Sequence, residues 1–170
     1  LKDGEEPCVE VKGLEKDKYI ISFDPSWAES ESSDDFAIQV FKLNDETKIG
    51  TLVHAYAVPG AKLKDHIVYF HYLLTSFNII AVVGDYNGGV QFINAANESS
   101  LFKKHNIHLG IIDTDLTKPE KYESELREIK KQYDVGLKNF CFLRKPTSQW
   151  IRQANELLQS NFDHRKILFA

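Results

Sequence analysis

The sequence predicts an α/β fold in which a mixed sheet, made of an antiparallel three-strand meander plus parallel strands, is flanked by helices. Three observations support this prediction. The first third of the chain holds strand-like segments separated by polar turns, the middle alternates helical and strand patterns, and the last third is mainly helical in period. Successive strands followed by alternating helices and strands are typical of a sheet with helices on its faces.

Three strand candidates come first, at residues 19–23, 36–43 and 49–58. They are rich in β-branched and aromatic residues, and residues 44–48 have the composition of a hairpin loop. We therefore expect an antiparallel meander. Residues 1–18 are polar and lack a clear period, which predicts a linker or a short edge segment.

The apolar period then changes to that of a helix between residues 63 and 77, and a nearly all-apolar segment at 79–83 predicts a strand buried on both faces. The remaining expected elements are a helix from about residue 90 to 105, a strand at 107–112, helices near 122–133 and 150–162, and a strand at 166–170.

The resulting order, β-β-β-α-β-α-β and then helices, is that of the ribonuclease H-like arrangement, in which the first and fourth strands lie side by side. Asp24 ends the first strand and Asp85 ends the fourth, so the two carboxylates are expected to be neighbours. Ligands bind at the carboxyl ends of strands in such sheets. Because carboxylate oxygens suit a hard divalent cation, the pair predicts metal-assisted phosphoryl chemistry.

Each acid also has a structural interpretation. Asp24 precedes Pro25 and, taken alone, is typical of a turn. Asp85 is followed by a Gly-rich turn and a helix, so it is also a candidate N-cap. The acidic segment 27–35 is either a solvated hairpin loop or a source of further carboxylates near a cation, of which Asp35 is the best placed.

Composition limits the other function classes. The 170 residues are enough for one domain with its own core, and no apolar run is long enough to cross a membrane. Two cysteines, Cys8 and Cys141, are too few for a disulfide framework and predict reduced thiols. Neither a phosphate-binding loop nor a dinucleotide fingerprint occurs. No nucleophile elbow occurs, although a Ser-His-Asp or Cys-His site stays open.

Charge is unevenly distributed along the chain. Residues 1–129 carry 13 Lys and Arg against 22 Asp and Glu, whereas residues 130–170 carry 8 against 3. An acidic body with a basic C-terminal quarter is compatible with binding a phosphate backbone along one side, and equally with a solvated surface.

Two acidic motifs and a C-terminal stretch resemble the nuclease domain of viral terminase large subunits of the tailed-phage type. Residues 20–26 (Ile-Ile-Ser-Phe-Asp-Pro-Ser) and, after a polar loop, 34–38 (Asp-Asp-Phe-Ala-Ile) resemble the first acidic motif. Residues 82–89 (Val-Val-Gly-Asp-Tyr-Asn-Gly-Gly) are similar to the second, an apolar strand that ends in an acid and a Gly-rich turn. The stretch from 150 to 170 is similar to one that precedes the third acid of that family.

The resemblance implies that residues 19–170 are a ribonuclease H-like nuclease domain, a metal-dependent endonuclease that cuts concatemeric viral DNA during genome packaging. One or two Mg²⁺ or Mn²⁺ ions would be bound, with Asp24 bridging them, Asp85 holding one and Asp35 adding an outer contact. A third acid is implied on a late helix, for which Asp163 is only a stand-in. The candidate phosphate-binding residues are Arg144, Lys145, Arg152, Arg165 and Lys166.

The resemblance also implies a setting. The chain is expected to be a fragment, truncated at its C-terminus, of a protein with an ATPase motor domain. Its partners would be double-stranded DNA, the small terminase subunit and the portal, in the cytoplasm of the infected host cell and away from membranes. The alternatives are a catalytically incomplete ribonuclease H-like module for DNA or protein docking, a resolvase- or transposase-like nuclease, and a Rossmann-like small-molecule enzyme.

Overall fold

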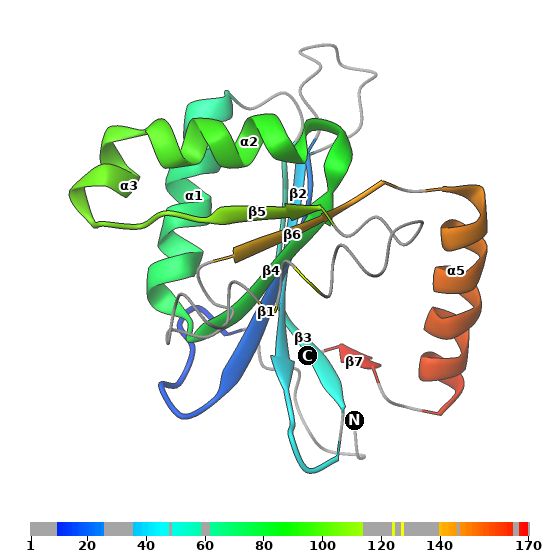
Figure 1. Ribbon diagram of the computed structural model, residues 1–170. Coiled ribbons are helices and arrows are strands. Elements are labelled where there is room, and N and C mark those ends of the chain that lie inside the picture. Colours follow the sequence, from blue (N-terminus) through cyan, green and yellow to red (C-terminus); the bar gives the residue numbers. More distant parts are fainter. Residues whose placement is uncertain are drawn as a thin grey trace.

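The computed structural model describes residues 10–25, 36–47, 49–58, 62–113, 124, 127, 140–145, 147–164 and 167–169, with the backbone alone at 149, 150 and 167–169. The elements in chain order (Figure 1) are β1 (Lys18–Asp24), β2 (Phe36–Leu43), β3 (Gly50–Val58), α1 (Leu63–Ser76), β4 (Ile79–Asp85), α2 (Tyr86–Glu98), α3 (Ser100–Lys104), β5 (Gly110–Asp113), β6 (Phe140–Arg144), α5 (Ser148–Asp163) and β7 (Ile167–Phe169).

Within this described part of the chain, seven strands form one sheet in the order β5-β6-β4-β1-β2-β3-β7. β2 runs antiparallel to its neighbours β1 and β3, whereas the β1–β4, β4–β6, β5–β6 and β3–β7 pairs are parallel. The predicted mixed sheet with an opening meander is confirmed, and the topology is ribonuclease H-like.

Three details of the sequence prediction were wrong. No strand was expected at β6, which lies between β4 and β5 in the sheet. The expected strand at 107–112 is shorter and ends one residue later, at Asp113. The helix expected from residue 90 to 105 starts at Tyr86 and is divided into α2 and α3. The helix expected near 122–133 falls outside the described residues except at positions 124 and 127.

Helices α1, α2 and α3 lie on one side of the sheet, and α5 lies on the other (Figure 1). An aromatic cluster fills the space between the sheet and the first group. Phe23 of β1 lies 6.0 Å from Phe70 of α1 and 5.3 Å from Phe92 of α2, measured between ring centroids. All three side chains are almost fully buried. Burial of large aromatic surfaces supplies much of the stabilising free energy of such a core.

A buried histidine joins the meander to α1. His66 is 1% exposed and stacks on Phe36 with ring centroids 4.0 Å apart. Its Nδ1 lies 3.1 Å from the hydroxyl of Tyr56 on β3, so this buried polar ring has a hydrogen-bond partner.

None of the helices in the described segments combines the length and the apolar character needed to cross a bilayer.

Candidate functional site

The pairing of β1 with β4 brings the two predicted acids to one place. The strands are parallel, and their last paired residues are Phe23 and Gly84. Asp24 follows the first and Asp85 follows the second, so both carboxylates stand at the carboxyl edge of the two neighbouring central strands. Sixty residues of sequence lie between them, yet the strand pairing brings them to neighbouring positions. This adjacency is what the sequence predicted.

The side of the sheet follows from the register. Residues that pair across parallel strands share a face, and successive residues alternate. Phe23, Gly84 and Leu143 form one row, which faces α1 and α2. Asp24 and Asp85 belong to the next row and therefore start from the opposite face.

The side chain of Asp85 fixes the backbone that leads from β4 into α2. Oδ1 of Asp85 accepts a hydrogen bond of 2.8 Å from the backbone N–H of Asn87, so the residue caps α2 as well as ending β4. Asn87 and Gly88 then depart from helical geometry, and Gly88 has a φ of 80°. That value lies in the left-handed region, which glycine adopts without a steric cost. The N-cap interpretation of Asp85 is therefore correct, and it leaves Oδ2 outside this bond.

Arg144 of β6 is in register with Asp85. Since β6 lies on the other side of β4 from β1, the row reads Asp24, Asp85, Arg144 across three neighbouring strands. Two acids and one guanidinium thus share a single edge. Arg144 was a candidate from the sequence on charge alone; its position beside Asp85 depends on a strand that the sequence analysis did not find.

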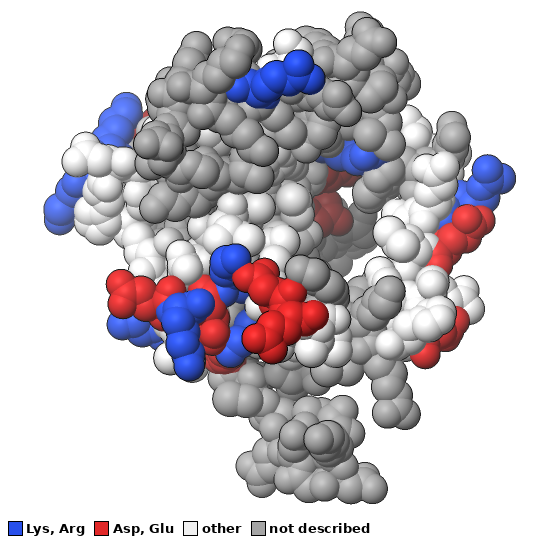
Figure 2. Space-filling model, turned by 60° about the horizontal axis from the view of Figure 1, so that its bottom comes forward, with Lys and Arg blue, Asp and Glu red and all other residues white. Residues whose placement is uncertain are grey.

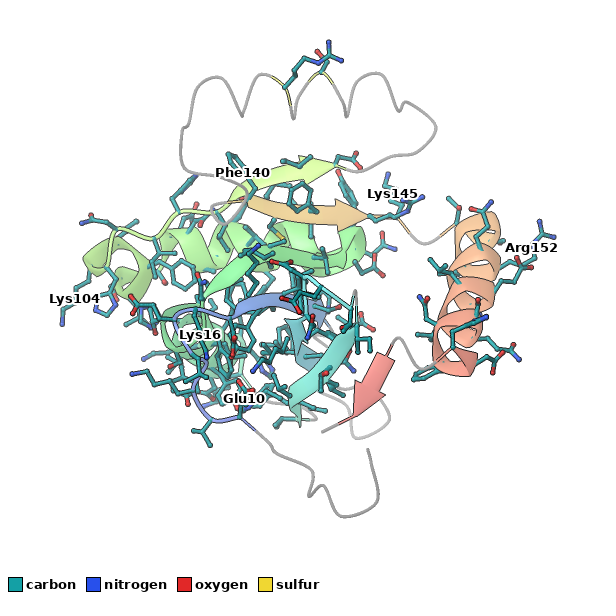
Figure 3. The ribbon with its side chains drawn as sticks, turned by 90° about the horizontal axis from the view of Figure 1, so that it is seen from below. Glu10, Lys16, Lys104, Phe140, Lys145 and Arg152 are labelled. Carbon is teal, nitrogen blue, oxygen red and sulfur yellow. The ribbon has the colours of Figure 1, made fainter. Side chains whose placement is uncertain are left out.

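Lys145 follows Arg144 and is exposed. Its Nζ lies 4.8 Å from the centroid of the Tyr86 ring, a distance typical of a cation–π interaction. Tyr86 is the residue after Asp85, so Lys145, which follows the end of β6, also lies beside the junction of β4 and α2. Figure 3 shows Lys145 at the end of β6.

Of the other predicted cations, the structure describes only Arg152, which does not join this group. Arg152 lies on α5, and Figure 3 shows it on the side of that helix turned away from the sheet. A shallow hollow of about 480 Å³ follows the same side of α5, lined by Ser148, Ile151, Arg152, Asn155, Glu156 and Gln159. Asp35, Arg165 and Lys166 lie outside the described residues.

A third strand-ending acid, Asp113 of β5, was missed by the sequence analysis. The signal was present, since Ile111 and Ile112 precede it as apolar strand residues precede Asp24 and Asp85. Its Oδ1 is buried and makes no hydrogen bond. Asp113 is in register with Leu143 of β6, the strand that lies between β5 and β4. Asp113 is therefore two strand spacings from β4, about 10 Å.

The metal-ligating side chains of the described residues do not form a cluster. The described residues contain no group of three or more His, Cys, Asp or Glu placed to hold a metal ion together. Asp163, at the end of α5, is exposed and belongs to no such group. Cys141 of β6 is fully buried, and burial raises the pKa of its thiol. A buried protonated thiol is a poor nucleophile, which argues against a cysteine site there.

The opposite end of β1 is also charged, but its charges are paired. Lys42 lies 2.6 Å from Asp17 and 3.4 Å from Glu10, and Lys18 pairs with Asp45. The Lys42 ammonium lowers the pKa of the Asp17 carboxyl. Figure 2 shows acids and basic residues intermingled on this underside. Such a mixed surface offers little attraction to a polyanion.

The carboxyl edge is thus a compact arrangement of two carboxylates, one arginine in the same row and one lysine held over an aromatic ring. Carboxylates suit a divalent cation, and the two basic residues suit an anion beside it. The chain matches no protein-family model, and no curated protein is significantly similar to it.

Proposed function

We propose that this protein is a divalent-metal-dependent DNA endonuclease that hydrolyses phosphodiester bonds. The observation that carries the proposal is the parallel pairing of β1 with β4, which sets Asp24 beside Asp85 at the carboxyl edge. Arg144 and Lys145 support it, since they add positive charge beside the acids at the same edge. Acids for a cation and bases for a phosphate are the two requirements of this chemistry.

Mg²⁺ or Mn²⁺ fits the donors of this edge. Mg²⁺ is commonly held by one or two carboxylates, with water and substrate phosphate completing its shell. Asp24 and Asp85 would hold the ion, and Asp85 would use Oδ2 because Oδ1 fixes the turn into α2. When bound, such an ion lowers the pKa of a coordinated water and polarises a phosphate oxygen. Arg144 would orient the phosphate beside Asp85.

The sequence resemblance supplies the substrate and the setting of the proposal. We infer that the DNA is double-stranded and is cut as concatemers during viral genome packaging. On the same basis the partners would be an ATPase motor domain of the parent chain, the small terminase subunit and the portal, in the infected cell. Binding is expected to be sequence-tolerant, because phosphate contacts position a protein without identifying bases.

The test is cleavage of a supercoiled plasmid in the presence of Mn²⁺. Asp24→Asn and Asp85→Asn are expected to lower the nicking rate by at least about 100-fold, since even residues that only orient metal ligands cost up to about that much. Glu98→Gln, an exposed acid at the end of α2, is the matched control and should nick like the wild type. Calorimetry gives a second readout, in which Asp24→Asn and Asp85→Asn should both lose the binding of Mn²⁺. Equal nicking by all the proteins would contradict the assignment.

One observation favours a second candidate, a ribonuclease H-like module that docks DNA or protein without cutting. The described residues hold a pair of acids and not a group of three. A docking module would bind duplex DNA with the same affinity in the presence and absence of Mn²⁺, and calorimetry would detect no binding of Mn²⁺ to the protein. Comparison of branched with linear duplexes in the same assay distinguishes a resolvase-like nuclease, which would prefer the branched substrate.

A further inference from the structure

The end of β6 presents two consecutive cations to two consecutive residues of the β4–α2 junction. Arg144 is in register with Asp85, and Lys145 places its Nζ over the ring of Tyr86. Lys145 directly follows the last residue of β6, so the two basic residues are consecutive at this edge. Lys145 was a candidate phosphate-binding residue from its charge, whereas no role was predicted for Tyr86.

Tyr86 has a defined place. It is partly buried and packs against the core cluster. The residue before it is fixed by the hydrogen bond from the Asn87 N–H to the Asp85 carboxylate. An aromatic ring held in this way presents a face of negative potential, which attracts an ammonium group. The ring therefore restricts a side chain that would otherwise sample many rotamers.

Lys145 differs in this respect from the lysines at the other end of the sheet. Lys18 and Lys42 are neutralised by nearby carboxylates. Among the described residues, the ion pairs within 4.0 Å do not include Lys145. Contact with a ring leaves the ammonium its full charge and its N–H donors, and a lysine of this kind is a point-charge binder of phosphate.

We propose that Lys145 binds a DNA phosphate beside the Asp24–Asp85 pair and that Tyr86 is a positioning residue that holds Lys145 for this contact. The inference rests on the proposed function in taking DNA as the ligand, and it identifies which cation meets the backbone at the acidic edge. Arg144 occupies the same row as the acids, and Lys145 extends the positive charge toward α2.

The experiment measures binding of a fluorescent DNA duplex by anisotropy, in EDTA, over a range of salt concentrations. Lys145→Gln should reduce the slope of log affinity against log salt by about 1, the change expected for one lost phosphate contact. Tyr86→Leu should weaken binding about two- to fivefold, the equivalent of one exposed cation–π contact. Tyr86→Phe keeps the ring and should bind like the wild type.

The double variant separates positioning from a general structural effect. If Tyr86 acts through Lys145, Tyr86→Leu adds nothing to the binding defect of Lys145→Gln. Equal losses from Tyr86→Leu in the two backgrounds would overturn the positioning role. Lys104→Gln, which removes the same charge from α3 at the far end of the molecule (Figure 3), is the control and should keep the wild-type slope.

The outcomes also distinguish this inference from the proposed function. An unchanged slope in Lys145→Gln overturns the inference, even if Asp24→Asn still abolishes cleavage. A reduced slope in a protein that never cleaves DNA keeps the inference and removes the nuclease. Lys145 is exposed, so its variant is expected to fold, and the slope decides the proposal even if Tyr86→Leu proves unstable.

Discussion

Gly84 allows the strand that carries Asp85 to lie against the ring of Phe23. A Cβ atom at this position would be 2.6 Å from both Cε1 and Cζ of Phe23. The ring cannot move aside easily, because it is 3% exposed and packed between Phe70 and Phe92. The glycine is therefore a packing requirement of the row directly beneath the two acids.

Gly84→Ala is expected to lower the free energy of unfolding by about 1–3 kcal/mol, the usual cost of overpacking a core. Denaturant unfolding followed by circular dichroism measures the change. Gly50→Ala is the matched control on β3, because the nearest atom to its added Cβ is 4.0 Å away, on Leu43. A Gly84 variant as stable as the control would show that the Phe23 ring yields without cost.

At the scale of elements, strands with a clear composition could be predicted from the sequence. The first three strands and β4 are rich in β-branched and aromatic residues, and their pairing follows from short connections and from the crossover through α1. The predicted strand pairing was therefore sufficient to place Asp24 beside Asp85 from the sequence alone. The element boundaries near Asp113 and Tyr86 differed from the prediction, since caps and kinks depend on individual side chains such as Asp85.

Strand β6 could not be predicted in the same way. Phe140–Arg144 is a five-residue segment whose apolar part is buried without regular alternation, and such short runs have no diagnostic period. Its position between β4 and β5 depends on pairing with strands that lie far away in the sequence, which local sequence patterns do not reveal. Because this strand was missing, Arg144 and Lys145 were known only as part of a basic quarter.

The contact between α1 and the end of α3 includes two histidines. Nε2 of His71 lies 2.7 Å from Nδ1 of His105, and His71 is 8% exposed. Burial, and then the neighbouring His105, lower the pKa of His71 from its ordinary value of 6.5. A histidine with a lowered folded-state pKa stabilises the fold fully above its unfolded pKa. That contribution is lost as the pH falls from 6.5 toward the folded value.

His71→Gln is therefore expected to flatten the decline in the free energy of unfolding between pH 7 and pH 5.5. Denaturant titrations at several pH values measure it, and the slope difference between wild type and variant isolates His71 from the other histidines. His108→Gln, at an exposed position, should retain the wild-type decline. If the variant and the wild type lose stability in parallel as the pH falls, His71 has the same pKa in the folded and unfolded states.

At the scale of the whole molecule, packing is uneven across the sheet. β1 has a paired strand on each side and its alternate residues Tyr19, Ile21 and Phe23 are buried in the core. β7 at one edge pairs through three residues with β3. Helix α5 lies on the other side of the sheet from α1 and α2, and its large apolar side chains remain exposed, with Leu157 at 63%.

Regions with few buried apolar contacts open before the global unfolding of a protein. We therefore expect amides of α5 and β7 to exchange with deuterium much faster than those of β1 and β4, under conditions where the whole protein stays folded. Mass spectrometry of peptic fragments measures this directly, with residues 148–163 compared against 18–24. Exchange of both segments at one common rate would mean that α5 unfolds only with the core. Faster exchange would instead identify α5, which carries Arg152, as a unit whose opening leaves the acidic edge intact.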